Sequence, residues 1–95
     1  MPTFEVAHIR EQGQDIIIIL MSRSFGNQSQ EEQNKISIML KECATAAGLA
    51  GTVVPVWDSG GGRMKFLAPQ PWHPFFRNLS LRDVAANINR KLTCG

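Results

Sequence analysis

The chain has few cysteines and no long apolar segment, and both absences exclude whole classes of protein. Of its 95 residues two are cysteine, Cys43 and Cys94, and they form no Cys-x-x-Cys pair. A zinc knuckle and a thioredoxin-type redox site are therefore excluded, while the sequence leaves open whether the two thiols are free or joined. The longest apolar run is too short to span a bilayer, and the N-terminal residues do not have the pattern of a signal peptide. We expect a cytoplasmic protein with no membrane partner.

The chain also lacks a strong net charge. Ten Lys and Arg residues against eight Asp and Glu residues give +2 at pH 7, which by itself does not indicate nucleic-acid binding. The charge is unevenly distributed, because residues 1–50 hold four basic and six acidic side chains while residues 51–95 hold six and two. The basic C-terminal half points to an anionic partner, nucleic acid included. An ordinary solvated surface is the simpler explanation.

Catalytic motifs are missing as well. Neither a Walker spacing nor Gly-x-Gly-x-x-Gly occurs, so nucleotide binding has no signature. We find no paired carboxylates, metal-ligand cluster or nucleophile elbow, and we therefore assign no catalytic residue, no metal and no cofactor. His8 and His73 would meet a cysteine only through the fold, and Cys43 falls on the apolar side of a predicted helix, where a cysteine packs as a small hydrophobe. We expect no enzymatic activity and keep a His–Cys enzyme as a third hypothesis.

The chain does contain a regular alternation of strand and helix patterns. Strands are expected at residues 3–10, 15–22, 52–57 and 63–67. The second strand is apolar at every position from Ile16 to Met21, which is typical of an interior strand covered on both faces. Pro55 lacks a backbone donor and favours an edge or a bulge in the third strand.

Helices are expected to begin at Ser29 and Ser80, each with an acidic residue at the spacing of a capping box. Gly48 ends the first helix, and the second continues to about Leu92. The first helix has an apolar side formed by Ile36, Met39, Leu40, Cys43, Ala46 and Ala47. The apolar side of the second helix is formed by Leu81, Val84, Ala85, Ile88 and Leu92.

These elements predict an α+β fold in the order ββαββα. We expect a two-layer sandwich, a four-stranded mixed sheet with the two helices packed on one face. A chain of this length makes a single globular domain, residues 1–95, and buries only roughly 60% of the surface that its unfolded form exposes. Dimerisation would cover apolar surface that such a small core leaves open.

The loop after the isoleucine-rich strand is the candidate anion-binding site. It combines hydroxyls, an amide and a guanidinium just before a helix: Ser22, Arg23, Ser24, Asn27 and Ser29. Free amides at a helix N-terminus, beyond the carboxyl end of a strand, attract a phosphate or carboxylate group. The simpler interpretation is that Asn27 and Ser29 only cap the helix while Arg23 faces water.

An aromatic segment is the candidate partner interface. It contains three large rings and a histidine among prolines: Trp72, His73, Phe75 and Phe76. Covered by their own domain, these side chains form a lid over the core, which is the interpretation we favour because a small core needs the area. Covered by another chain, they form an interface hot spot.

Two functional hypotheses follow. The first is a small non-catalytic interaction module that self-associates as a homodimer or binds a protein partner. The alternative is a binder of an anionic ligand, either nucleic acid or a phosphorylated small molecule, through the Ser22–Ser29 loop or the basic C-terminal half.

Overall fold

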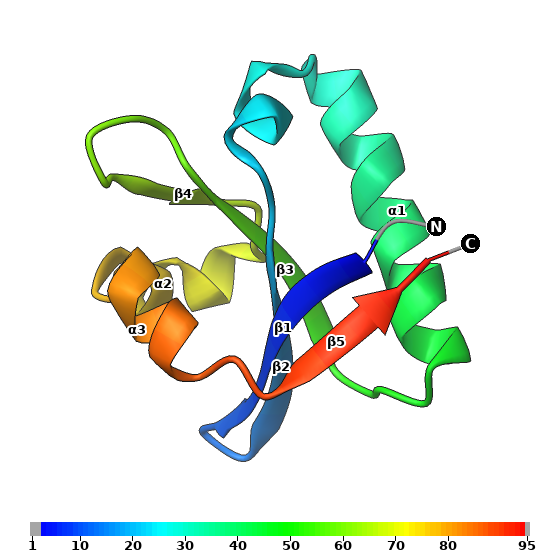
Figure 1. Cartoon of the computed structure of the whole chain (residues 1–95). Helices are drawn as coiled ribbons and strands as arrows, with labels where there is room; N and C mark the ends of the chain where they lie inside the picture. Colours follow the sequence, from blue (N-terminus) through cyan, green and yellow to red (C-terminus); the bar gives the residue numbers. More distant parts are fainter. Residues whose placement is uncertain (1–2, 95) are drawn as a thin grey trace.

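The sheet of this protein is mixed, with β2 at its centre. In the computed structural model, which describes residues 3–94, five strands pair in the order β4-β3-β2-β1-β5. The strands are β1 (Thr3–Glu11), β2 (Gln14–Leu20), β3 (Thr52–Asp58), β4 (Met64–Phe66) and β5 (Arg90–Thr93). The helices are α1 (Gln30–Ala46), α2 (His73–Arg77) and α3 (Leu81–Ala86), with short 3₁₀ helices η1 (Arg23–Asn27) and η2 (Gln70–Trp72). The predicted α+β class with a mixed sheet is confirmed (Figure 1).

β2 is the interior strand that its composition predicts. Its four consecutive isoleucines, Ile16–Ile19, are all buried. β2 pairs antiparallel with β1 through a tight turn at Gln12 and Gly13, which both have positive φ, and parallel with β3 after the crossover through α1. The sheet therefore needs apolar cover on both of its faces.

Different helices supply that cover on the two faces. On one face, Leu40 and Ala44 of α1 pack in a cluster with Ile17 and Ile19. On the other face, a second cluster contains Ile16, Ile18 and Val56 together with Trp72, Phe76 and Val84 from η2, α2 and α3. Figure 1 shows α1 on one side of the sheet, and α2 and α3 on the other. The expected packing of both helices on one face is wrong, because a strand that is apolar on both sides cannot leave one side open.

The C-terminal residues form a fifth strand and not the second half of a helix. α3 ends at Ala86, and the Asn89 side chain then bonds both the N–H and the C=O of His8 at 2.9 Å. β5 continues from this point antiparallel to β1, and Leu92 is buried in the α1-side cluster with Val6. The helical spacing of Ile88 and Leu92 is misleading here, because the open edge of β1 offers backbone hydrogen bonds to this segment. The four strands expected become five within residues 3–94.

β3 lies in the interior of the sheet, although Pro55 favours an edge. The Pro55 carbonyl accepts a 3.0 Å hydrogen bond from the Leu67 N–H. The residue pairs between β3 and β4 run only from Val56 to Asp58. Proline is accommodated here because its missing N–H falls where the pairing with β4 stops.

The ends of α1 confirm the predicted caps. The Ser29 hydroxyl accepts a 3.1 Å hydrogen bond from the Glu32 N–H. At the other end, Gly48 has φ +79°, and the N–H groups of Gly48 and Leu49 bond the carbonyls of Thr45 and Ala44. These two bonds make the Schellman motif that a C-terminal glycine predicts. At α3, Ser80 and Asp83 form the complete capping box, whereas at α1 only the Ser29 half is formed and the Glu32 carboxylate lies 3.8 Å from the Lys35 ammonium.

The buried side of α1 differs from the expected one. Leu40 is buried as predicted, and Gln33 and Ala44 are buried as well. Gln33 is accommodated because its side-chain amide donates a 3.0 Å hydrogen bond to the Phe25 carbonyl. Three residues expected to be buried are instead exposed: Met39, Ala46 and Ala47.

Cys43 and Cys94 form a disulfide. It joins the last turn of α1 to the residue after β5, across a Cα–Cα distance of 5.5 Å and a sequence separation of 51. Cys94 is buried in the α1-side cluster. The disulfide therefore fixes the edge strand β5 to the helix that covers it.

Candidate functional site

The predicted anion-binding loop forms η1 and the N-terminal cap of α1. The hydroxyls of Ser22 and Ser24 lie 2.7 Å apart and bond each other. Arg23 donates to the Asp58 carboxylate at 3.1 Å, and Ser29 is the cap of α1. The structure thus places these groups along one short segment, but several of their hydrogen-bonding groups already have partners within the protein. A ligand at this loop would compete with the Asp58 carboxylate for Arg23.

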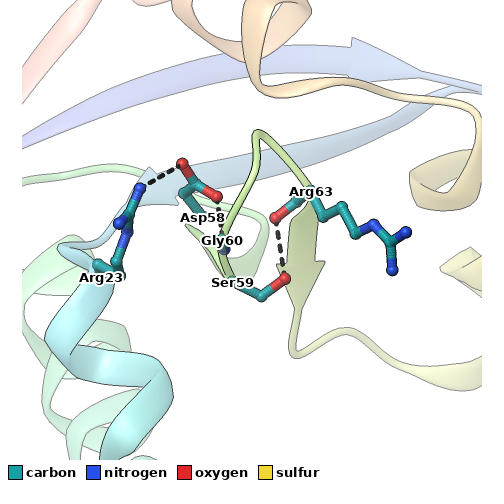
Figure 2. Close-up of polar contacts among 5 residues, drawn as sticks. All are labelled: Arg23, Asp58, Ser59, Gly60 and Arg63. Atoms are coloured by element: carbon teal, nitrogen blue, oxygen red, sulfur yellow. Dashed lines mark hydrogen bonds and ion pairs between the residues drawn. The ribbon is translucent and has the colours of Figure 1, made fainter.

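Asp58 organises the turn between β3 and β4. One carboxylate oxygen accepts from Arg23, and the other accepts a 2.8 Å hydrogen bond from the Gly60 N–H. The Ser59 hydroxyl and N–H both donate to the Arg63 carbonyl, at 3.1 and 2.8 Å. Figure 2 shows Arg23 and Asp58 facing each other, while the guanidinium of Arg63 points away from both.

The environment of Asp58 favours its ionised form. The Gly60 N–H and, after it, the Arg23 guanidinium hold the pKa of the Asp58 carboxyl below its ordinary value of 3.8. Partial desolvation opposes them without cancelling the effect. The sequence singled out Arg23 but not Asp58, because the two residues are separated by 35 positions and meet only when β3 lies beside β2.

The aromatic segment packs against the sheet. Trp72 and Phe76 are buried, while His73 and Phe75 are half-buried. The rings of Phe66 and Phe76 have centroids 5.3 Å apart, and a nitrogen of His73 lies 2.9 Å from the Ala68 carbonyl. The two buried rings of this segment, Trp72 and Phe76, thus belong to the core of this chain. A partner interface at this segment would have only the remaining surface of His73 and Phe75 to contact.

A groove beside α1 was not recognised from the sequence. Two hollows of about 430 and 280 Å³ lie between α1 and the start of β3, and both are lined by Lys41 and Val53. Leu67 and Ser37 line the smaller one. The Ser37 hydroxyl is buried there and has no hydrogen-bond partner within residues 3–94. The groove arises because β4 is short and leaves this flank of α1 without a neighbouring strand.

The outer face of α1 carries an apolar pair. Ile38 is 58% exposed and Met39 38% exposed, and these are the large apolar side chains that residues 3–94 present to solvent. A shallow, open depression lined by Lys41, Glu42, Thr45 and Ala46 follows them along the helix. The sequence did hold a signal. Ile36, Ile38, Met39 and Leu40 crowd five positions, more than one face of a helix can bury.

Catalytic chemistry finds little support in this geometry. The His–Cys hypothesis loses its nucleophile, because both cysteines are in the disulfide. Within residues 3–94 no group of three or more His, Cys, Asp or Glu side chains is arranged to hold a metal ion.

The described helices are all too short or too polar to cross a membrane.

Comparisons with known proteins add no family to this description. The chain matches no protein-family model, no curated protein and no solved structure.

Proposed function

We propose that this protein is a small non-catalytic interaction module that self-associates or binds a protein partner through the outer face of α1. The observation that carries the proposal is the exposed pair Ile38 and Met39 on a helix whose other side is already packed on the sheet. Solvent-facing positions of a helix are normally polar, and apolar side chains grouped beside hollows mark interaction sites. Covering these two side chains removes apolar surface from water, which stabilises a complex by about 25 cal/mol for each Å² that is buried.

This proposal moves the interaction surface away from the aromatic segment. Trp72 and Phe76 already contribute their area to the core of the monomer. Side chains used in this way cannot also be the energetic centre of an interface without unfolding the lid. The α1 face needs no such rearrangement, which favours it as the contact surface.

Sedimentation velocity together with amide NMR tests the proposal. We expect the sedimentation coefficient to rise with protein concentration, and the amide signals of α1 around Ile38 to shift in the same range. If the protein sediments as a monomer up to millimolar concentration, self-association is excluded. A protein partner is then tested by placing a photo-crosslinking amino acid at position 38, and the absence of any specific cross-linked product would reject the proposal entirely.

A second candidate function, binding of an anionic ligand, is favoured by the uneven charge. Residues 51–95 carry a net +4, and Arg90 and Lys91 are exposed on the edge strand β5. Titration with single-stranded nucleic acid and with inorganic phosphate, each at two salt concentrations, tests it. Binding through these side chains falls steeply with salt. A flat response, or no binding at low salt, rejects this function.

A cytoplasmic location remains part of the proposal, and the disulfide makes it testable. Cytosolic thiols are kept reduced, whereas oxidising compartments keep disulfides closed. Alkylating free thiols during cell lysis, followed by mass spectrometry, reports the state of Cys43 and Cys94. A cytoplasmic protein is expected to show mostly alkylated cysteines. A fully closed disulfide would place the protein in an oxidising compartment.

A further inference from the structure

We infer that two copies of this chain pair through α1 in an antiparallel arrangement about a two-fold axis. The two Ile38 side chains then meet close to the two-fold axis. The inference rests on the proposed self-association and specifies its geometry. It commits to a second copy as the occupant of the α1 face, because an exposed apolar side chain with a lysine one turn before it and a glutamate one turn after it is complementary to itself.

The shape of the face matches this pairing. Ile38, Glu42 and Thr45 are spaced by four and three residues and therefore share one side of the helix, opposite the buried Leu40 and Ala44. Ile38 is the most prominent apolar side chain on this side. In a two-fold interface the same surface is used by both copies, so a residue near the axis meets its own counterpart. An antiparallel partner centred on Ile38 therefore covers both Ile38 side chains at once.

The charges select the antiparallel direction. Lys35 lies one turn before Ile38, and Glu42 lies one turn after it. Antiparallel pairing brings Lys35 of each copy toward Glu42 of the other, whereas parallel pairing would set lysine against lysine and glutamate against glutamate. Lys35 is free to make the contact, because its side chain is 64% exposed and its pairs with Glu31 and Glu32 are long, at 3.7 and 3.8 Å. Antiparallel helices also oppose their dipoles favourably.

The edge strand β5 offers a less suitable surface for a second copy. β5 carries Arg90 and Lys91, both exposed, and lysine or arginine on an edge strand disfavours edge-to-edge pairing. Two identical β5 strands would place these four positive charges together. A single pair of helices makes a small interface, so we expect a dissociation constant in the range of roughly 10 µM to 1 mM.

Charge reversal with rescue provides the test, read by sedimentation equilibrium. Each single variant, Lys35→Glu or Glu42→Lys, places like charges together at two symmetry-related contacts, and we expect each to raise the dissociation constant about tenfold. The double variant Lys35→Glu/Glu42→Lys restores opposite charges and is expected to return the constant to within about threefold of the wild-type value. Arg82→Glu, an exposed charge reversal on α3 across the sheet, is the matched control and should have no effect.

Ile38→Lys and an NMR contact complete the test. Ile38→Lys is expected to abolish dimerisation while amide spectra show an intact fold, because this side chain is mostly exposed. In a mixture of differently labelled copies, an isotope-filtered NOE between the methyl groups of the two Ile38 side chains is expected. Because the filter selects contacts between differently labelled chains, the signal can only arise between copies.

The outcomes separate this inference from the proposed function. Dimers that persist unchanged in Ile38→Lys, or single charge variants that the double variant fails to rescue, overturn the α1 geometry but leave self-association intact. A wild-type protein that stays monomeric at all concentrations overturns this inference and the self-association, and the binding of a protein partner is then decided by the cross-linking experiment at position 38.

Discussion

At the residue scale, two polar side chains connect segments that are distant in the sequence. Asp58 joins the β3–β4 turn to Arg23 before α1, and Asn89 joins the start of β5 to His8 on β1. Both use charged or amide groups that satisfy backbone or side-chain donors in fixed geometry. The contribution of each side chain to stability can therefore be tested by a single substitution.

Asp58→Asn should flatten the dependence of stability on acid pH. The pKa of Asp58 is lowered in the folded protein, so its carboxylate contributes stability above the ordinary value of 3.8, and this contribution is lost as the pH falls through the lower folded value. Urea midpoints measured at pH 7 and near pH 3 should differ less in the variant than in the wild type.

Arg23→Gln is the informative control for Asp58. Since the Gly60 N–H, the largest single cause of the lowered pKa, is kept while the hydrogen bond and the charge of Arg23 are removed, this variant should keep part of the wild-type pH dependence. An Asp58→Asn protein that loses stability in acid as steeply as the wild type would contradict the assignment.

Asn89→Ala should destabilise the fold by about 1–2 kcal/mol, because two hydrogen bonds to the His8 backbone are lost. Thermal unfolding measures this loss directly. Asn87→Ala is the matched control. Asn87 donates a single bond to the Asp83 carbonyl within its own helix, so a smaller effect is expected. Equal effects of the two variants would mean that the two hydrogen bonds between Asn89 and His8 add no more stability than the single bond of Asn87.

At the element scale, η1 is positioned by close contact with β3. Phe25 is buried and its ring lies 4.9 Å from the Trp57 ring, in an edge-on arrangement. The next residue, Gly26, lies so close to the Trp57 side chain that a Cβ at this position would be 2.5 Å from the Trp57 Nε1. This contact fixes the path of the chain from β2 into α1.

Gly26→Ala tests the contact between η1 and β3. The added methyl group requires the Trp57 ring to move, and we expect a loss of about 1–3 kcal/mol. Gly48→Ala serves as comparison, because a Cβ there meets open space and the variant suffers only from the positive φ of +79°. Tryptophan fluorescence should change in Gly26→Ala and not in Gly48→Ala; identical spectra would argue against the predicted displacement of Trp57.

The sequence predicted elements best where the signal is local. The capped ends of α1 and the apolar β2 depend on residues within a few positions of each other, and they are confirmed. The helix expected through Leu92 is wrong, because its fate is decided by the edge of β1, some 80 residues earlier, as the 81-residue separation of His8 and Asn89 shows. Local spacing carries no information about such an edge.

The candidate sites divide in the same way. The loop residues Ser22 and Arg23 were recognisable as polar groups beside a helix, yet the partner of Arg23, Asp58, was not. Ile38 does not follow the spacing of the one apolar side that the sequence predicts for α1. Met39 does follow this spacing, yet it is exposed. Which side of a helix packs on a sheet depends on tertiary contacts such as the Gln33 bond to Phe25, which no helical period reveals.

At the scale of the whole molecule, the disulfide links the helix that follows the central strand to the residue that follows the edge strand β5. α1 follows the central strand, and Cys94 follows the outermost one, so the bond closes a loop of 51 residues that includes β3, β4 and the aromatic segment. Such a cross-link stabilises chiefly by restricting the unfolded chain.

Opening the disulfide should therefore lower the free energy of unfolding by about 4 kcal/mol, the amount the chain-entropy relation gives for a loop of this length. Urea unfolding of the oxidised protein, the reduced protein and Cys43→Ser/Cys94→Ser measures it. The reduced protein and the double variant should agree with each other. Hydrogen exchange should show the loss first in β5, which pairs with only one neighbouring strand. Unchanged midpoints on reduction would contradict this view.

The pairing of β5 with β1 has a consequence for biosynthesis. A ribosome delivers Thr93 ninety residues after Thr3, its neighbour across the sheet. During that interval the nascent chain exposes the outer hydrogen-bonding groups of β1, and the apolar side of Val6 waits for Leu92. Contacts so distant along the chain form slowly. The time needed to translate these ninety residues thus sets the shortest period for which the outer edge of β1 stays open to other strands.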